Sequence, residues 1–348
     1  MARERLITAE ATDEEPTSAI AASLRPERLV DYVGQRDLKE RLSIALGAAR
    51  DRGEALEHLL LHGPPGLGKT TLAHIIAREL GTKAYVTSGP ALSKASDLVG
   101  TLTRMESRDI LFIDEIHRLP PTVEEYIYPA MEDGRIDFTV DSGMHARVVT
   151  LDLKPFTLIG ATTRPGLLSQ PLRDRFGLRH HLGFYAEREL AEILARAAER
   201  LEMALPADAQ ATLAARSRGT PRVALRLLRR VRDFSHVRAN GRLGTSIVAD
   251  ALELEGVDPR GLDALDRSYL RVLGEIYECG PVGVEAIAAS MGEDAGTLED
   301  VVEPYLLQIG FVARTRQGRC LTRLGATHAG ISFRERTGEL FSSDPGRD

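Results

Sequence analysis

Residues 63–70 read Gly63-Pro64-Pro65-Gly66-Leu67-Gly68-Lys69-Thr70, and this stretch decides the fold. It matches the pattern G-x-x-x-x-G-K-[ST], in which a glycine-rich turn wraps around phosphate oxygens. A largely apolar run of strand length, residues 56–62, precedes it, and a helical pattern, residues 69–80, follows it. This context favours a phosphate-binding loop over the alternative, a glycine-rich turn with a solvated lysine. The stretch therefore predicts a P-loop that binds ATP.

The residue types of this loop suggest a role for each polar position. Its glycines, Gly66 and Gly68 among them, allow backbone N–H groups and the start of the helix to point at negative charge. We expect Lys69 to reach the β and γ phosphates, and the Thr70 hydroxyl to bind Mg²⁺. The next residue, Thr71, is placed to contact the phosphate nearer the sugar.

A second candidate motif is an apolar run, residues 110–113, that ends in two acids, Asp114 and Glu115. We expect Asp114 to hold the Mg²⁺ shell and Glu115 to align and deprotonate the attacking water, because phosphoryl transfer needs both tasks. An acidic pair after an apolar run is also common in solvated turns. Its spacing from the P-loop favours the catalytic interpretation.

The rest of the chain divides by its hydrophobic pattern. Strand patterns alternate with helical ones up to about residue 186, which predicts an α/β fold with a parallel sheet and helices on both faces. A purely helical pattern follows, and after a glycine-rich linker at 255–261 three helices and two short strands predict a winged helix. We therefore predict a large P-loop ATPase domain with its lead-in (1–185), a small helical lid domain (186–256) and a winged-helix DNA-binding head (257–348).

Composition narrows the class of protein. The 348 residues are 43% hydrophobic and 28% charged, which is typical of a globular chain. No apolar run reaches the roughly 20 residues that span a bilayer, and the opening residues carry acids where a signal peptide is apolar. We therefore expect a cytoplasmic protein that does not enter a membrane. The net charge of -6 argues against a protein that simply coats DNA, although residues 310–336 form a local basic patch.

Four further segments carry a resemblance to a known family: residues 114–118 (DEIHR), 160–164 (GATTR), 172–177 (LRDRFG) and 219–222 (GTPR). Their order and spacing resemble the RuvB family of AAA+ ATPases over about residues 24–336. The resemblance implies an AAA+ P-loop sheet, a helical lid and a C-terminal winged helix. It also implies a homo-hexameric ring that uses ATP to drive branch migration of Holliday junctions in recombination and repair. The implied partners are double-stranded DNA at four-way junctions, a RuvA-like junction-binding protein and a RuvC-like resolvase in the same complex.

The resemblance assigns catalytic roles to three residues outside the two motifs. It makes Thr163 the sensor of the γ phosphate, Arg175 the arginine finger that enters the neighbouring subunit's site, and Arg222 the second sensor over the subunit's own nucleotide. From the residues alone, the arginines could equally belong to solvated basic loops and helices. The resemblance also places a set of residues around the nucleotide: Leu24, Arg25, Tyr32, Val33, Tyr185, and, from the large domain, Glu132, Asp133 and Gly134.

The basic patch favours a DNA contact through the hairpin of the winged helix. The third helix of this domain is acidic and contains no lysine or arginine, so phosphate would repel it. Arg314, Arg316 and Arg319 instead lie on or between the two predicted strands, 311–316 and 319–323, which predicts sequence-independent contact with the DNA backbone. The family reads R-T-P-R-G-R where this chain reads RTRQGR, so the resemblance supports Arg314 and Arg319, whereas Arg316 is shifted by one residue from the family's arginine. On a strand, that move would reverse its face. The alternative is a basic hairpin without a ligand.

Residues 135–153 alternate apolar and polar positions around Gly143, which predicts an exposed hairpin with an apolar side. Exposed apolar strands invite a protein partner. The resemblance implies that this hairpin docks the RuvA-like protein, although the tip, residues 141–145, departs from the family sequence.

A competing interpretation is a nucleotide-dependent DNA-binding switch of the replication-initiator type, which also joins an AAA+ module to a winged helix. The hairpin and the GTPR segment favour the motor. Steady DNA-stimulated turnover would separate a motor from a switch that hydrolyses ATP slowly.

Overall fold

The computed structural model describes residues 24–140 and 147–333. Contacts within the chain separate it into two units, Met1–Ala251 and Leu252–Asp348, which are described in turn. In the described parts, no helix is long and apolar enough to cross a membrane.

The first unit is built on a five-stranded parallel sheet in the order β2-β3-β6-β1-β7. The strands are β1 (Leu59–His62), β2 (Ala84–Ser88), β3 (Ile110–Asp114), β6 (Thr157–Thr162) and β7 (Leu178–His181). The three inner strands consist almost wholly of buried residues, because a parallel sheet covered on both faces needs apolar side chains on each. The predicted α/β fold is confirmed.

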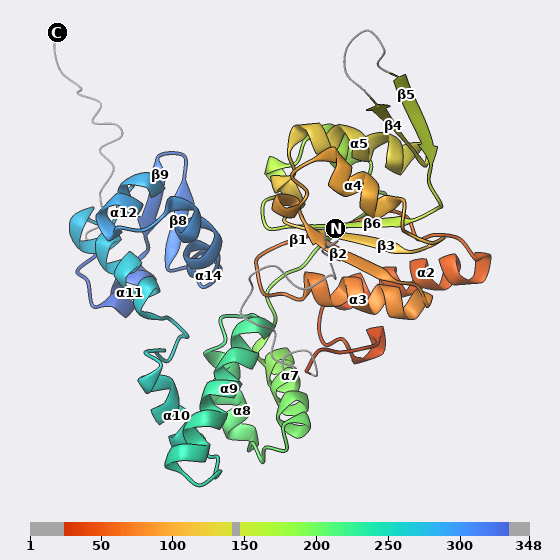
Figure 1. The fold of residues 1–348 in the computed structure, drawn as a ribbon. Coiled ribbons are helices and arrows are strands. Elements are labelled where there is room, and N and C mark those ends of the chain that lie inside the picture. Colours follow the sequence, from red (N-terminus) through yellow and green to blue (C-terminus); the bar gives the residue numbers. More distant parts are fainter. Residues whose placement is uncertain (1–23, 141–146, 334–348) are drawn as a thin grey trace, which may run out of the picture. The chain divides into compact units, whose positions relative to one another are not determined.

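Helices cover both faces of this sheet (Figure 1). The helices α2 (Arg36–Arg52) and α3 (Lys69–Leu80) lie on one face, and α4 (Ala95–Leu102) and α5 (Pro121–Glu132) on the other. Strand residues alternate between the faces, so Leu111 and Ile113 join the core under α4 and α5. The short 3₁₀ turns of this unit are Leu29–Asp31, Gly89–Ala91, Ile116–Arg118 and Pro165–Leu167, and the short helix α6 spans Gln170–Asp174.

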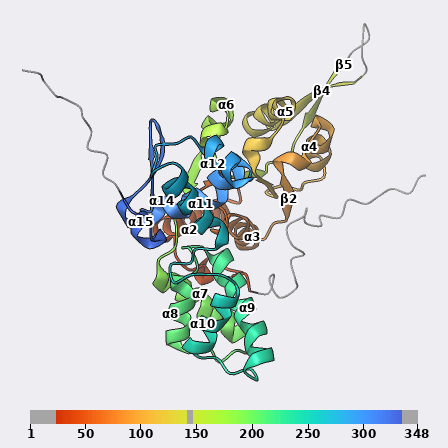
Figure 2. The same cartoon turned by 90° about the vertical axis from the view of Figure 1, so that its left-hand side faces the viewer.

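The predicted hairpin is present as β4 (Arg135–Val140) and β5 (Arg147–Asp152), paired antiparallel. It projects from the sheet and its helices in both views (Figures 1 and 2). The expectation of an exposed apolar side is wrong for Ile136, which is fully buried against the core below α5, whereas Val149 is exposed. The predicted tip, residues 141–145, lies outside the described residues.

The helical part of the first unit follows the sheet. Its helices are α7 (Glu187–Arg200), α8 (Ala207–Ala215) and α9 (Pro221–Arg238), and α10 (Thr245–Leu254) leads across the boundary into the second unit. Thr220 caps α9, because its hydroxyl accepts a hydrogen bond from Val223 N–H at 3.4 Å and Pro221 occupies the first helical position. This cap sets the start of α9 and therefore the position of Arg222.

The second unit is a winged helix around the fully buried Tyr269. Its elements are α11 (Ala264–Arg271) with a π-helical turn (Val272–Ile276), α12 (Val284–Met291), α13 (Ala295–Thr297) with a π-helical turn (Leu298–Val302), α14 (Glu303–Gln308), β8 (Val312–Thr315), β9 (Gly318–Leu321) and α15 (Arg323–Ala329). The hairpin strands are shorter than predicted. Arg316 and Gln317 therefore form the turn, and the expectation that Arg316 lies on a strand is wrong.

Candidate nucleotide site and nucleic-acid surface

The P-loop joins β1 to α3 through three glycines with positive φ, Gly63, Gly66 and Gly68. A Cβ on Gly66 would lie 2.9 Å from Cβ of Arg222, and one on Gly68 would lie 2.9 Å from the Tyr32 hydroxyl. Glycine is required at both positions for conformation and for space. The loop is therefore shaped by close contact with the residues that surround it.

Lys69 is buried at the start of α3 and points back into the loop. Its Nζ donates hydrogen bonds to the carbonyl oxygens of Gly63 (2.8 Å) and Pro64 (2.9 Å). Burial lowers the pKa of Lys69, and the charges of Asp114 and Glu115 oppose that shift. A phosphate group in this loop would favour the charged lysine, because it supplies negative charge to a desolvated cation.

A cleft runs over the P-loop and has two adjoining halves. The half beside Lys69 is lined by residues including Arg25, Gly66, Gly68, Thr70, Thr71, Asp114, Glu115 and Arg222. The other half is lined by residues including Leu24, Tyr32, Val33, Leu67 and Tyr185. The first half is polar and the second is more apolar, which suits the phosphates and the base of a nucleotide respectively.

The apolar half is held by a pair of buried tyrosines. Tyr185 donates its hydroxyl hydrogen to Tyr32 Oη at 2.9 Å, and Tyr32 donates to the carbonyl oxygen of Leu67 at 3.1 Å. Burial raises the pKa of Tyr185 to about 12 and raises that of Tyr32 well above its usual value. Both phenols are therefore neutral donors at physiological pH, and they tie the P-loop to the segments on either side of it.

The acidic pair lies at the end of the buried strand β3. Glu115 has a φ of 47°, a rare conformation for a residue with a side chain, and its N–H donates to Asp114 Oδ1 at 2.9 Å. Thr163, at the end of the neighbouring strand β6, lies with Oγ1 3.5 Å from Glu115 Oε2. The geometry brings together the predicted water-activating carboxylate and the predicted γ-phosphate sensor.

His117 is a candidate site residue to which the sequence patterns assigned no role. Its Nδ1 lies 3.3 Å from Glu115 Oε2 and 2.8 Å from Thr162 Oγ1, and its side chain is almost wholly buried. These contacts hold Glu115 between β3 and β6. The histidine stands two positions after the acidic pair, but the contact with Thr162 depends on strand order, which a linear pattern does not contain.

Arg175 and residues 132–134 lie apart from these groups. Arg175 donates from Nη2 to Glu132 (2.9 Å) and from Nη1 to the carbonyl oxygen of Pro171 (2.8 Å), and its guanidinium stacks 4.5 Å from the centre of the Tyr128 ring. In the described part of the chain, Arg175 does not line the cleft over the P-loop, and neither do residues 132–134. The predicted site residues therefore form two separate groups within one chain.

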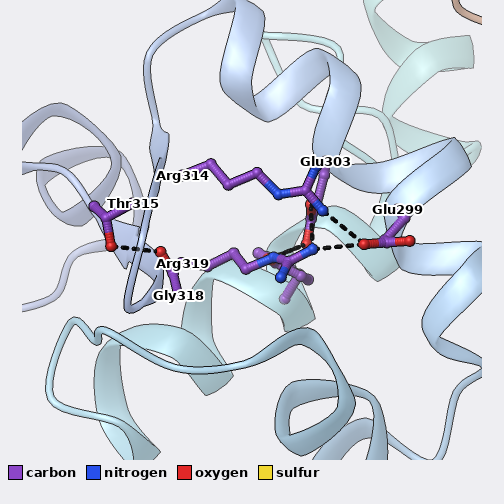
Figure 3. A network of polar contacts seen from close by, with 7 residues as sticks. Glu299, Glu303, Arg314, Thr315, Gly318 and Arg319 are labelled. Carbon is purple, nitrogen blue, oxygen red and sulfur yellow. Dashed lines mark hydrogen bonds and ion pairs between the residues drawn. The ribbon is translucent and has the colours of Figure 1, made fainter. Parts of the chain in front are cut away.

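The three arginines of the β8–β9 hairpin differ in their surroundings. Arg314 and Arg319 extend toward Glu299 and Glu303 (Figure 3), with Arg319 Nε 2.9 Å from Glu303 and Arg314 Nη2 2.6 Å from Glu299. Arg316 is exposed in the turn and makes no ion pair with any residue in the described part of the chain. The predicted DNA surface thus combines two paired arginines with one that extends freely from the hairpin turn.

Models of three protein families match consecutive parts of the chain. The Holliday junction DNA helicase RuvB P-loop domain matches residues 24–182, the RuvB AAA lid domain matches 185–258, and the RuvB C-terminal winged helix domain matches 259–330. The chain belongs to the RuvB family. It is consequently a P-loop ATPase, and nucleotide binding follows from membership.

Individual RuvB proteins are similar over nearly the full length. The Holliday junction branch migration complex subunit RuvB of Kosmotoga olearia is 52% identical over 340 residues, which cover 98% of each chain. The solved structure of the Thermotoga maritima RuvB Holliday junction branch migration motor is 50% identical, with a TM-score of 0.83 over 89% of this chain and 99% of that one. A point mutant of the same Thermotoga maritima RuvB gives a TM-score of 0.84 over 90% of this chain and 100% of the other, also at 50% identity.

Proposed function

We propose that this chain is the ATP-driven motor subunit of a ring that moves DNA through Holliday junctions, the reaction called branch migration. The observation that carries the proposal is its membership of the RuvB family along almost its whole length, together with a relative named as a branch migration complex subunit. The polar half of the cleft offers the groups that ATP hydrolysis needs, and the winged helix offers positive charge for a DNA backbone.

In the proposed reaction, Lys69 binds the β and γ phosphates, and Glu115 orients and deprotonates the attacking water. Thr163 and His117 hold the Glu115 carboxylate from two sides, so that it acts from a fixed position. Thr70 and Asp114 line the same half of the cleft and are the groups that would hold Mg²⁺. Bound Mg²⁺ would neutralise the negative charge that develops during phosphoryl transfer.

The second group of site residues serves the neighbouring subunit in this proposal. Arg175 and residues 132–134 lie together outside the cleft of their own chain, which is the arrangement expected if they complete a site across a subunit boundary. A positive charge supplied to the γ phosphate raises the rate of hydrolysis by about a thousandfold or more. Assembly of a homo-hexamer then becomes a condition of turnover.

The proposed partners are double-stranded DNA at four-way junctions and a RuvA-like protein that docks on the hairpin of residues 135–153. Val149 provides an exposed apolar side chain on β5 for that contact. A RuvC-like resolvase in the same complex remains an implication of the family alone.

The test is branch migration of a synthetic four-way junction, measured with ATP and Mg²⁺, with and without a RuvA-like partner. We expect the junction to come apart through branch migration only when ATP is present, and we expect the partner to stimulate this reaction. The alternative, a nucleotide-dependent switch, would bind the junction in the presence of ATP without moving it and without steady DNA-stimulated hydrolysis.

A further inference from the structure

The helix α6 (Gln170–Asp174) is short, and Arg175 is its C-terminal cap. A helix of this length makes few hydrogen bonds of its own, so contacts with other elements must fix its position. Leu172 secures its inner side, because this residue is fully buried in the core that α5 also covers. The Arg175 side chain lies outside that core and is 23% exposed. Its direction therefore depends on contacts of its own.

Tyr128 of α5 contacts both ends of α6. Its hydroxyl oxygen lies 3.1 Å from Oγ of Ser169, which caps the start of α6 by accepting a hydrogen bond from Leu172 N–H at 3.2 Å. The face of its ring carries the guanidinium of Arg175, whose Cζ lies 4.5 Å from the ring centre. One side chain thus connects the residue just before α6 with the residue just after it.

Glu124, one turn before Tyr128 on α5, holds the tyrosine hydroxyl. The hydroxyl donates to Glu124 Oε1 at 2.5 Å, and Oγ of Ser169 donates to the same oxygen. Burial raises the pKa of Tyr128, and the hydrogen bond to Glu124 raises it further, so the phenol is a neutral donor at physiological pH. The ring is therefore held at its hydroxyl end, on a helix that the buried Ile127 anchors in the core.

The guanidinium of Arg175 uses its face and its edge for different contacts. The face rests on the Tyr128 ring, whereas the edge donates from Nη1 to the carbonyl oxygen of Pro171 (2.8 Å) and from Nη2 to Glu132 (2.9 Å). A planar cation can stack on a ring and still donate hydrogen bonds to an anion in its own plane. Glu132 is exposed, so its ion pair contributes little and can be exchanged for a phosphate while the ring contact remains.

We propose that Tyr128 is a positioning residue for Arg175. Its ring fixes the direction of the guanidinium, and its hydroxyl ties that ring to the start of α6. The inference rests on the proposed function, in which Arg175 completes the site of the neighbouring subunit. It assigns to Tyr128 a role in hydrolysis that is exercised only through the arginine.

The strength of the ring contact sets the size of the expected effect. Stacking of an arginine on an aromatic ring favours the stacked orientation by about 3- to 30-fold. Loss of the ring should therefore slow hydrolysis at the neighbouring site by about that factor, far less than the roughly thousandfold effect of losing the arginine. Because the finger acts on charge that develops in the transition state, the loss should appear in kcat at saturating ATP, with KM for ATP unchanged.

The experiment uses rings mixed from two kinds of full chain, with ATP, Mg²⁺ and duplex DNA. The acceptor chain is Arg175→Ala, which keeps its P-loop but lacks the finger. The donor chain is Lys69→Ala, which keeps the finger but lacks a working P-loop. Hydrolysis in the mixture then comes from interfaces at which an acceptor P-loop meets a donor arginine. The donor is also made with Tyr128→Leu, Tyr128→Gln or Tyr128→Phe, and co-assembly of each mixture is verified by size-exclusion chromatography.

Two controls separate positioning from a general effect on folding or assembly. The first places Tyr128→Leu in the acceptor chain, where the substitution has no arginine to act through. The second is Tyr126→Leu in the donor chain, because Tyr126 lies on the same helix and packs against the same core.

We expect Tyr128→Leu and Tyr128→Gln in the donor to lower kcat of the mixture by about 3- to 30-fold, without a change in KM. Tyr128→Phe keeps the ring and should retain most of the activity. Neither control should lower the rate. The apolar and the polar replacement remove the same ring, so the prediction remains testable if one of the two variants does not fold.

Equal kcat with and without Tyr128→Leu in a co-assembled donor would overturn the inference. An equal loss from Tyr128→Leu in the acceptor, or from Tyr126→Leu in the donor, would also overturn it, because either result would show a general effect on the fold. A starting mixture that co-assembles but is inactive would instead contradict the proposed completion of the site across the boundary, and the inference with it. That mixture contains no substitution at Tyr128, so the two failures are distinguishable.

Discussion

Lys69 and Glu115 line the same cleft, but their chemistry assigns them to different steps. Lys69→Ala removes a charge that binds phosphate, so ATP affinity should fall by about 10- to 100-fold. Glu115→Gln keeps the size of the side chain but removes the base, so ATP binding should persist while turnover falls by about 100-fold or more. Binding of a fluorescent ATP analogue and steady-state hydrolysis separate the two effects. Parent-like ATP affinity in Lys69→Ala, or near-normal hydrolysis in Glu115→Gln, would contradict these roles.

His58 gives a second prediction at the scale of one residue. Its Nδ1 accepts a hydrogen bond from Leu158 N–H at 2.9 Å, so the proton of the neutral ring is on Nε2, which lies 3.2 Å from the carbonyl oxygen of Met131. Burial lowers the pKa of His58 below its usual value of 6.5. Protonation would break the bond to Leu158. At this site the folded chain binds fewer protons than the unfolded chain. The contribution of His58 to the free energy of unfolding is therefore fully present above about pH 6.5 and decreases as the pH falls below that value.

The measurement is the midpoint of thermal unfolding of the parent and of His58→Asn, at pH 7.5 and at pH 5.0, values on either side of the usual histidine pKa of about 6.5. The variant should be less stable at the higher pH but should lose less stability on acidification. His62, His74 and His180 also have lowered pKa values, so the difference between parent and variant isolates His58. Equal losses in both proteins would show that His58 does not contribute to the pH dependence.

Single residues differ in how far the sequence could predict their place in the site. The P-loop residues and the acidic pair occupy short segments with fixed spacing, so their approach to one cleft follows from one strand–turn–helix unit and a second parallel strand of the same sheet. The contact of Tyr128 with Arg175 joins α5 to the end of α6, and the contact of His117 with Thr162 joins two strands that are adjacent only in space. Those contacts require the tertiary fold.

At the scale of elements, the sequence predicts those with a strong local pattern. The predicted helix 69–80 matches α3, whose start is set by the P-loop. The sequence does not predict the strands β2 and β7. Both lie at the edges of the sheet and carry half-exposed or polar residues, as the sequence LRHH of β7 illustrates. The predicted wing strands were too long because the ladder ends at the pair Thr315 and Gly318, which leaves Arg316 and Gln317 as the turn.

The hairpin formed by β4 and β5 gives a prediction for a whole element. The side chain of Val149 on β5 is exposed, whereas that of Ile136 on β4 belongs to the core. Val149→Asp should therefore weaken stimulation of the ATPase by a RuvA-like partner, because a charge replaces an apolar contact. Basal hydrolysis and the thermal midpoint should not change. A matched control is Val237→Asp, which places the same charge at an exposed valine of α9. Equal stimulation of Val149→Asp and the control would remove the hairpin as the docking element.

At the scale of the whole molecule, the arrangement of the site residues is the one expected if neighbouring subunits cooperate in the proposed ring. One chain contains a P-loop cleft with the predicted second sensor, Arg222, whose N–H lies 3.3 Å from the carbonyl oxygen of Gly66. The same chain holds Arg175 elsewhere, stacked on Tyr128 and paired with Glu132. We expect a chain built in this way to bind ATP alone and to need a neighbour's arginine for rapid hydrolysis.

The most direct test of this account is the ATPase activity of a mixture of two inactive variants. Arg175→Ala should bind ATP through its intact P-loop but fail to hydrolyse it, and Lys69→Ala should fail because it does not bind ATP. In a ring formed from equal amounts, about one interface in four would join an intact P-loop to an intact finger. If sites fire independently, activity should return in the mixture to a level well above that of either variant. If co-assembly is demonstrated and the mixture remains as inactive as its components, independent completion of each site across the boundary is contradicted. Normal DNA-stimulated hydrolysis by Arg175→Ala alone would contradict the finger itself.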